Sequence, residues 1–255
     1  MGKTIEIVTH CYRYSRALTY QLESLWRNYS DDSNRFRVTV FFSGKDADTL
    51  AAVAEYQGRM PSQVHLHIQP LELLYVRAIG RNVAALTTTA DWIWFTDCDY
   101  LFGPKCLHQL AEIDPFDEND KTLLTIDRLV FPRFVQTCKT HAIGDRYLDR
   151  VVDAGLHAYE HLIDPADFYP RGMGKAIGGL QIVPGRVARE KGYCNSDRKR
   201  QRPLAAVTPE TKFGEFHSDR AFRCQMGGCG TPIDLDDVYR LRHSRSFRDK
   251  GGADN

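Results

Sequence analysis

The first hundred residues alternate between strand-like and helix-like segments, and this rhythm constrains the fold more than any other feature of the chain. Runs of apolar and β-branched residues predict strands over 4–9, 35–42, 64–68 and 92–96. A helical spacing of apolar residues predicts helices between them, over 15–29, 46–57 and 75–89. This order is typical of a mostly parallel sheet with helices on both faces. We therefore predict an α/β fold.

The second half of the chain is less regular. Further strands are predicted over 122–126, 178–183 and 238–241, and helices over 105–113, from Val187 onward, and over 215–226. No linker divides the sequence into independent parts. We therefore expect a single domain over 1–245, followed by a frayed tail over 246–255.

The predicted helix 46–57 illustrates how its ends and its buried face are expected to form. Asp46 precedes the helix and is expected to cap it, and Gly58 is expected to end it. Leu50, Val53 and Ala54 form the apolar stripe that we expect to face the sheet.

Charge and hydropathy exclude several classes of protein. The formal net charge is +1, so the molecule as a whole has no electrostatic attraction to nucleic acid or membrane. No apolar run approaches the roughly 20 residues that cross a bilayer, and the first residues lack the apolar core of a signal peptide. We expect a cytoplasmic protein with no transmembrane segment and no nucleic-acid partner.

The seven cysteines are an odd number spread along the chain, without a CxxC pair. Cys194, Cys224, Cys229 and His217 can be drawn as a zinc site, but their spacing does not match the usual zinc motifs. We predict free thiols.

Two carboxylates follow the most apolar predicted strand. The segment 92–96 runs directly into Asp97-Cys98-Asp99, a DxD triplet. In an open α/β sheet, ligands bind at the carboxyl ends of the strands. Carboxylates there suit Mg²⁺ or Mn²⁺, which commonly bridge to phosphates. An isolated DxD triplet is more often a solvated turn, and the triplet 46–48, which precedes a helix, is assigned to helix capping.

The residues around this DxD resemble nucleotide-sugar glycosyltransferases of the family 2 type, which have the GT-A fold. Upstream lies a helix with the sequence Arg-Ala-Ile-Gly-Arg-Asn (77–82), and the chain opens with a strand and turn over 5–13 that resemble the family's first strand. Gly178-Gly179-Leu180-Gln181 resembles the strand on the acceptor side. The resemblance covers roughly residues 4–245 and is most specific at the DxD.

The resemblance implies a Rossmann-like GT-A domain, with a nucleotide-sugar half over 1–100 and an acceptor half over 101–245. It implies transfer of a sugar from a nucleotide diphosphate to an acceptor hydroxyl, with inversion at the anomeric carbon and a Mn²⁺ or Mg²⁺ cofactor. The donor would be bound by five residues: Thr9, Arg13, Arg81, Asp97 and Asp99. For Arg81, the competing interpretation is a surface helix arginine paired with an acid.

The base and the remaining metal ligand are expected near the carboxyl terminus. Asp219 is the first candidate for the general base, since its i, i+4 spacing from Arg223 puts both on one helix face, and Glu215 is the second. An ordinary helical ion pair explains the same spacing. The resemblance implies His243 as a metal ligand, with His217 a weaker candidate.

The sequence departs from the family pattern at two places. The family usually ends its second strand with an acid that helps to hold the nucleobase, whereas this chain has Phe42-Ser43-Gly44, with Asp46 as the nearest substitute. The family's Glu-Asp motif is also replaced, by Gly-Glu-Phe-His-Ser-Asp over 214–219.

The proposed partners follow from the donor chemistry. A UDP- or GDP-sugar is the expected donor, with a glycan or a lipid-linked acceptor. The basic residues over 186–202 and 240–250 are interpreted as a solvated surface or as an anion-binding rim that allows peripheral membrane contact.

Two other functions fit part of the pattern. A nucleotidyltransferase would share the nucleotide-binding half, but it usually has a Gly-rich loop after the first strand, and residues 11–15 contain no glycine. A non-catalytic nucleotide- or carbohydrate-binding module would explain the missing nucleobase acid and the altered base motif.

Overall fold

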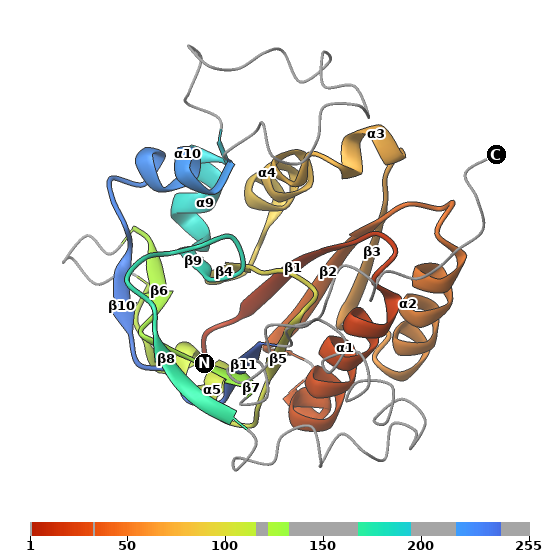
Figure 1. Cartoon of the computed structure of the whole chain (residues 1–255), viewed down its shortest axis with the longest axis horizontal. Coiled ribbons are helices and arrows are strands. Elements are labelled where there is room, and N and C mark those ends of the chain that lie inside the picture. Colours follow the sequence, from red (N-terminus) through yellow and green to blue (C-terminus); the bar gives the residue numbers. More distant parts are fainter. Residues whose placement is uncertain (1, 33, 116–121, 133–167, 195–217, 241–255) are drawn as a thin grey trace.

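The structure is a computed structural model that describes residues 2–32, 34–115, 122–132, 168–194 and 218–240. Figure 1 shows how these residues are arranged.

A seven-stranded, mostly parallel sheet forms the centre of the described part of the protein. Its strand order is β10-β6-β9-β4-β1-β2-β3. The strands β4, β1, β2 and β3 run parallel to one another, and β10 runs parallel to β6, whereas β9 is antiparallel to both of its neighbours. Their bounds are β1 Ile5–Cys11, β2 Phe36–Phe42, β3 Val64–Ile68, β4 Trp92–Phe95, β6 Leu124–Ile126, β9 Gln181–Pro184 and β10 Thr231–Ile233. The predicted α/β class is confirmed.

Helices cover both faces of this sheet, as Figure 1 shows. Helices α1 and α2 pack side by side on one face, and α3, α4 and α9 form a connected group on the other, next to α10. The bounds are α1 Ser15–Tyr29, η1 Ser30–Asp32, α2 Ala47–Arg59, α3 Leu71–Leu74, α4 Arg77–Thr87, α5 Cys106–Glu112, α9 Gly185–Lys191 and α10 Ser218–Gln225.

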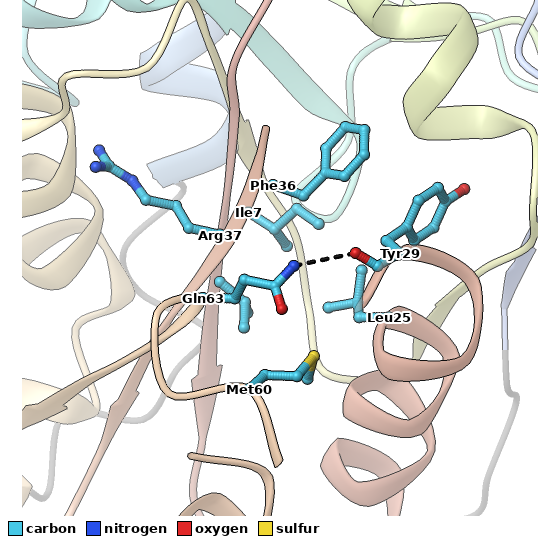
Figure 2. A pocket seen from close by; sticks show the side chains of 8 residues that line it. Ile7, Leu25, Tyr29, Phe36, Arg37, Met60 and Gln63 are labelled. Atoms are coloured by element: carbon cyan, nitrogen blue, oxygen red, sulfur yellow. Dashed lines mark hydrogen bonds between the residues drawn. The ribbon is translucent and has the colours of Figure 1, made fainter. Parts of the chain in front are cut away.

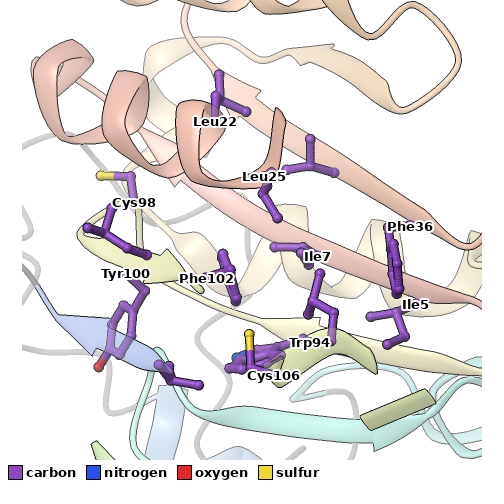
Figure 3. Close-up of a cluster of buried hydrophobic side chains, with 14 of the residues drawn as sticks. Ile5, Ile7, Leu22, Leu25, Phe36, Trp94, Cys98, Tyr100, Phe102 and Cys106 are labelled. Atoms are coloured by element: carbon purple, nitrogen blue, oxygen red, sulfur yellow. The ribbon is translucent and has the colours of Figure 1, made fainter. Parts of the chain in front are cut away.

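The hydrophobic core divides into two clusters, because alternate residues of a strand point to opposite faces. In β4, Trp92 and Trp94 join the cluster beneath α1, α2 and α5, whereas Ile93 and Phe95 join the cluster beneath α4, α9 and α10. Figure 3 shows part of the first cluster, in which side chains of α1 meet those of β1 and of the segment after β4. A strand buried on both faces explains the continuous apolar run 92–95.

A second, four-stranded sheet has the order β5-β11-β7-β8. Its strands are β5 Tyr100–Phe102, β7 Arg128–Pro132, β8 Phe168–Gly172 and β11 Val238–Arg240. Only β11 was predicted from the sequence. Strands such as β5 have three residues, too few to display the alternation by which a strand is recognised, and pairing with distant partners stabilises them instead.

Helix α2 differs from the prediction in two details. It continues through Gly58 to Arg59, and of the expected stripe only Val53 is buried, since Leu50 is 40% exposed and Ala54 is also exposed. The buried face of α2 consists instead of Thr49, Val53 and Tyr56. The Tyr56 hydroxyl donates a 2.6 Å hydrogen bond to the buried carboxylate of Glu23 on α1, which draws this face inward.

The predicted starts of two other elements also shift. Helix α4 begins at Arg77 rather than at 75, and β9 begins at Gln181 rather than at 178. Residues 178 and 179 form a turn that precedes β9.

A small pocket lies between α1, α2 and the sheet (Figure 2). Its lining is largely apolar and includes Ile7, Leu25 and Met60, while Gln63 donates a 3.0 Å hydrogen bond across it to the carbonyl of Tyr29. None of the sequence-predicted site residues lines this pocket. In the described part of the chain, no helix is both long enough and apolar enough to span a bilayer.

Candidate active site

The candidate residues lie where the topology brings several segments to one edge of the main sheet. The parallel strands β1, β2 and β4 all end at this edge. Because β9 is antiparallel to β4, with Gln181 opposite Phe95, the turn before β9 lies at the same edge. This is the edge at which open α/β sheets bind ligands.

Asp97, the first acid of the DxD, faces helix α4. Its Oδ1 accepts hydrogen bonds from Arg77 and from Nη2 of Arg81, the latter at 3.2 Å. Burial alone would raise the pKa of Asp97, but the two guanidinium groups outweigh it and lower the pKa to about 2. Asp97 is therefore an anion at neutral pH, and the two arginines of α4 compensate its charge.

Arg81 is a buried cation, and the interpretation of it as a surface residue is wrong. Its side chain has no exposed area. Besides Asp97, Nη2 donates to the carbonyl of Thr96 at 3.2 Å, and Nη1 donates to the hydroxyl of Tyr193 at 2.9 Å and to Oε1 of Gln181 at 3.4 Å. A buried guanidinium requires such partners because desolvation is costly.

Asp219 lies in the first turn of α10 and forms an ion pair with the same guanidinium. Its Oδ1 is 3.5 Å from Nη1 of Arg81, and its side chain is 32% exposed. The expected partner Arg223 donates instead to the carbonyl of Ala176 at 2.9 Å. Asp219 thus faces the edge of the sheet, and its i, i+4 spacing from Arg223 does not form an ion pair.

The turn before β9 has two glycines because other side chains lie against it. A Cβ at Gly178 would lie 2.5 Å from Oδ2 of Asp219, and a Cβ at Gly179 would lie 2.2 Å from the ring of Tyr100. Both distances are shorter than real Cβ contacts. The absence of side chains at 178 and 179 therefore leaves room for the carboxylate and the ring.

Asp99, the second acid, faces the other way and contacts the second sheet. Its Oδ2 accepts a 3.1 Å hydrogen bond from Nε of Arg240 in β11. The Arg240 guanidinium also lies 5.2 Å from the centre of the Tyr100 ring. Burial would lower the pKa of Arg240, but Asp99 more than offsets this and the pKa is raised. The two acids of the DxD therefore have different arginine partners.

Thr9 and Arg13 lie at the end of β1 and in the turn that follows. Thr9 is fully buried, and Arg13 has a positive φ of 59°. The Arg13 amide donates to Oδ2 of Asp46 at 2.6 Å. Asp46 also accepts hydrogen bonds from the amide of Thr49, which confirms its capping function, and from the Thr49 hydroxyl. Asp46 thus braces the turn and caps α2, which leaves it poorly suited to replace the nucleobase acid.

Buried polar atoms without hydrogen-bond partners within the described residues gather at this edge. They are Thr9 Oγ1, both ring nitrogens of His10, Arg81 Nε, Tyr100 Oη and Asp219 Oδ1. Folded proteins leave few buried polar groups unsatisfied, and those that remain commonly mark sites completed by water or a ligand. Their concentration here supports a polar ligand site.

The two acids of the DxD differ in their arginine contacts, and their binding of a metal stays a prediction. Carboxylate oxygens suit a hard cation, and Oδ2 of Asp99 accepts a hydrogen bond from Arg240 alone among the arginine contacts given above. Asp97 is less suitable, because both Arg77 and Arg81 bind its Oδ1. Across the described residues, no three His, Cys, Asp or Glu side chains group as a metal site. Glu215, His217 and His243 lie outside the described residues.

Several residues of the site were not predicted from the sequence. Arg77, Gln181, Tyr193 and Arg240 all contact candidate acids or Arg81. The sequence places Arg77 in the family-like helix, but no local signal marks Tyr193. The cysteines of the described residues are free thiols, as predicted, and Cys194 donates to the carbonyl of Ser218.

No family model matches the chain, and no curated protein matches it in sequence. Solved structures do match its fold. S. aureus TarS (residues 1–349) aligns with 93% of this chain and 60% of its own length, at 14% identity and a TM-score of 0.52. The Pyrobaculum calidifontis mannosyltransferase PcManGT, solved with GDP-Man and Mn²⁺, aligns with 97% of this chain and 59% of its own length, at 13% identity and a TM-score of 0.53.

These matches establish the fold of the described chain as the GT-A type that the sequence predicted. The chain spans about 60% of the length of TarS 1–349 and 59% of that of PcManGT.

Proposed function

We propose that this protein transfers a sugar from a nucleotide-diphosphate donor to an acceptor hydroxyl, as a glycosyltransferase of the hexosyltransferase type. The observation that carries the proposal is that Asp97 and Asp219 share the buried Arg81 at the carboxyl edge of the sheet, where Asp99 follows Asp97 in the chain and pairs with Arg240. Its likeness in fold to PcManGT, which was solved with GDP-Man, supports the same reaction class.

The donor is proposed to lie across the ends of β1 and β4. Thr9 offers a buried hydroxyl there, and Arg13 and Arg77 offer partly exposed cations for phosphate oxygens. Asp97 and Arg81 form an ion pair with each other. We therefore propose that they keep the donor half of the site in a fixed arrangement during the reaction. Because Asp46 is bound by Arg13 and Thr49, the base of the nucleotide must be recognised by other groups.

We assign the divalent metal, Mn²⁺ or Mg²⁺, to Asp99, with His243 as the proposed second ligand. Such an ion would stabilise the negative charge that develops on the leaving diphosphate. Arg240 would then serve the same phosphates, because its guanidinium lies beside Asp99 and is partly exposed.

Asp219 is proposed as the general base of an inverting transfer. The acceptor oxygen attacks the anomeric carbon, the bond from that carbon to the diphosphate oxygen breaks, and Asp219 takes the acceptor proton. A carboxyl group with one oxygen near Arg81 and the other toward the turn at Gly178 is placed for that step. Glu215 remains the second candidate. A glycan or a lipid-linked acceptor at a membrane surface is the proposed partner.

A ligand screen followed by a single substitution tests the proposal. Thermal shifts are measured with UDP-, GDP-, CMP- and dTDP-sugars, with and without Mn²⁺, because a ligand of the folded state raises the apparent stability. For a sugar that binds, release of the nucleoside diphosphate is then followed in the wild type and in Asp219→Asn. We expect unchanged donor affinity and a collapse of turnover in the variant. Equal turnover would exclude Asp219 as the base, and binding without any turnover would favour a non-catalytic module.

A further inference from the structure

We infer that Arg81 is a positioning residue that fixes the base Asp219 relative to the donor-side acid Asp97. This inference rests on the proposed function, and it revises the expectation that Arg81 binds the donor directly. The guanidinium has no exposed area, and its contacts are to side chains and a carbonyl of the protein.

One guanidinium spans the two halves of the site. Nη2 is 3.2 Å from Asp97 at the end of β4, and Nη1 is 3.5 Å from Asp219 at the start of α10. Arg77 completes an alternating chain of charges by binding Asp97 from the outer side. Because the opposite charges in this chain balance, moving any member would leave a buried or half-buried charge uncompensated.

Two neutral residues keep the guanidinium in its orientation. The Tyr193 hydroxyl accepts from Nη1 at 2.9 Å and donates to Oε1 of Gln181 at 2.7 Å. The Tyr193 ring stacks on Phe222 of α10 with centroids 4.1 Å apart. Gln181 also donates to the carbonyl of Asp219 at 3.5 Å. Arg81 is therefore locked to the same helix that carries Asp219.

The geometry has a chemical consequence. Asp219 lies at the start of α10, a short helix whose Phe222 packs in the same core cluster as α4, the helix that carries Arg81. The ion pair with Arg81 therefore restricts the motion of the Asp219 carboxylate, which is the proposed base. Such a residue affects the rate of the chemical step more than the binding of the donor.

The test compares two tyrosine hydroxyls that are both buried and hydrogen-bonded. Tyr193→Phe keeps the ring against Phe222 but removes the hydroxyl that holds Arg81. Tyr29→Phe, the matched control, removes a hydroxyl that bonds to the carbonyl of Gly103, next to the pocket beneath α1. Arg81→Lys keeps the charge but replaces the planar fork, so that it cannot reach both carboxylates as the guanidinium does.

The probes are UDP-glucose, UDP-N-acetylglucosamine, GDP-mannose and dTDP-glucose, each with Mn²⁺, and release of the nucleoside diphosphate is measured well below the unfolding temperature. We expect Tyr193→Phe to lower kcat by about tenfold or more and Arg81→Lys by about 100-fold. In both variants KM for the donor should stay within about twofold of the wild type. Tyr29→Phe should lower the melting temperature without lowering kcat.

Three results would overturn the inference. If Tyr193→Phe retains full kcat, Arg81 does not need its hydroxyl to position the base. If Arg81→Lys raises KM with kcat unchanged, Arg81 binds the donor instead. If the wild type turns over none of the four sugars although it binds one, the proposed function fails, and the inference fails with it.

Discussion

Arg240 and Asp99 form an ion pair at the edge of the second sheet, where the DxD triplet ends and β5 begins. Nε of Arg240, the last residue of β11, lies 3.1 Å from Oδ2 of Asp99, which directly precedes β5. The antiparallel pairing of β11 with β5 puts Arg240 opposite Tyr100 and so beside this carboxylate. The carboxylate proposed to bind the metal is thus already paired with the guanidinium of Arg240.

This pairing predicts competition between Arg240 and a metal ion. In Arg240→Gln, the affinity for Mn²⁺ without nucleotide should rise, because the ion no longer has to displace a guanidinium from Asp99. Titration calorimetry with Mn²⁺ alone measures it. Arg128→Gln is the control, since Arg128 pairs with Asp234 on the surface. An unchanged or weaker affinity in Arg240→Gln would contradict the assignment of the metal to Asp99.

The two acids of the DxD should respond differently to substitution. Asp99→Ala is expected to abolish the part of donor binding that depends on Mn²⁺, whereas full metal-dependent binding in that variant would show the DxD assignment to be wrong. Asp97→Asn should chiefly reduce stability, by about 2–3 kcal/mol. This is less than the loss for a fully buried pair, because 27% of the Asp97 side chain is exposed. Urea unfolding and donor calorimetry on both variants separate the two effects.

Gly178 offers a way to move the proposed base without changing any charge. A Cβ at 178 would lie 2.5 Å from Oδ2 of Asp219, a side-chain end that is able to shift. Gly178→Ala should therefore lower kcat while the protein remains folded and binds donor. Gly174→Ala is the matched control, because nothing lies within 4 Å of its added Cβ. Equal kcat in the two variants would mean that the position of this carboxylate does not limit the reaction.

His10 predicts a pH dependence of stability. Burial, followed by the charges of Arg81 and Arg77, holds the pKa of His10 well below its usual 6.5. Below pH 6.5, His10 binds a proton in the unfolded chain but stays neutral in the folded chain. The contribution of His10 to the free energy of unfolding is therefore present above pH 6.5 and is lost as the pH falls. The slope for one such group is about 1.4 kcal/mol per pH unit.

Urea unfolding between pH 5 and 7.5 tests this expectation. His10→Asn should flatten the dependence, whereas His65→Asn, at an exposed histidine, should leave it as in the wild type. Parallel curves for wild type and His10→Asn would show that His10 does not carry the pH dependence.

Much of the architecture was predictable because it depends on local pattern. The alternation of strands and helices over the first hundred residues, the apolar strand 92–95 and the acids after it follow from residue periodicity, and the structure confirms these elements. Asp46 was recognised as a cap because capping involves residues three positions apart. The second sheet was largely missed, because strands as short as β5 depend on partners far along the chain.

The sequence by itself determined which acids lie at the end of a buried strand, since the strand pattern and the DxD are both local. Only the tertiary structure decided what each acid contacts. Asp97 turns toward Arg81, and Asp99 toward Arg240, because α4 and β11 approach the strand end from different sides. Asp219 contacts Arg81 rather than its helix neighbour Arg223, since a buried guanidinium needs an anion more than an exposed helix face does.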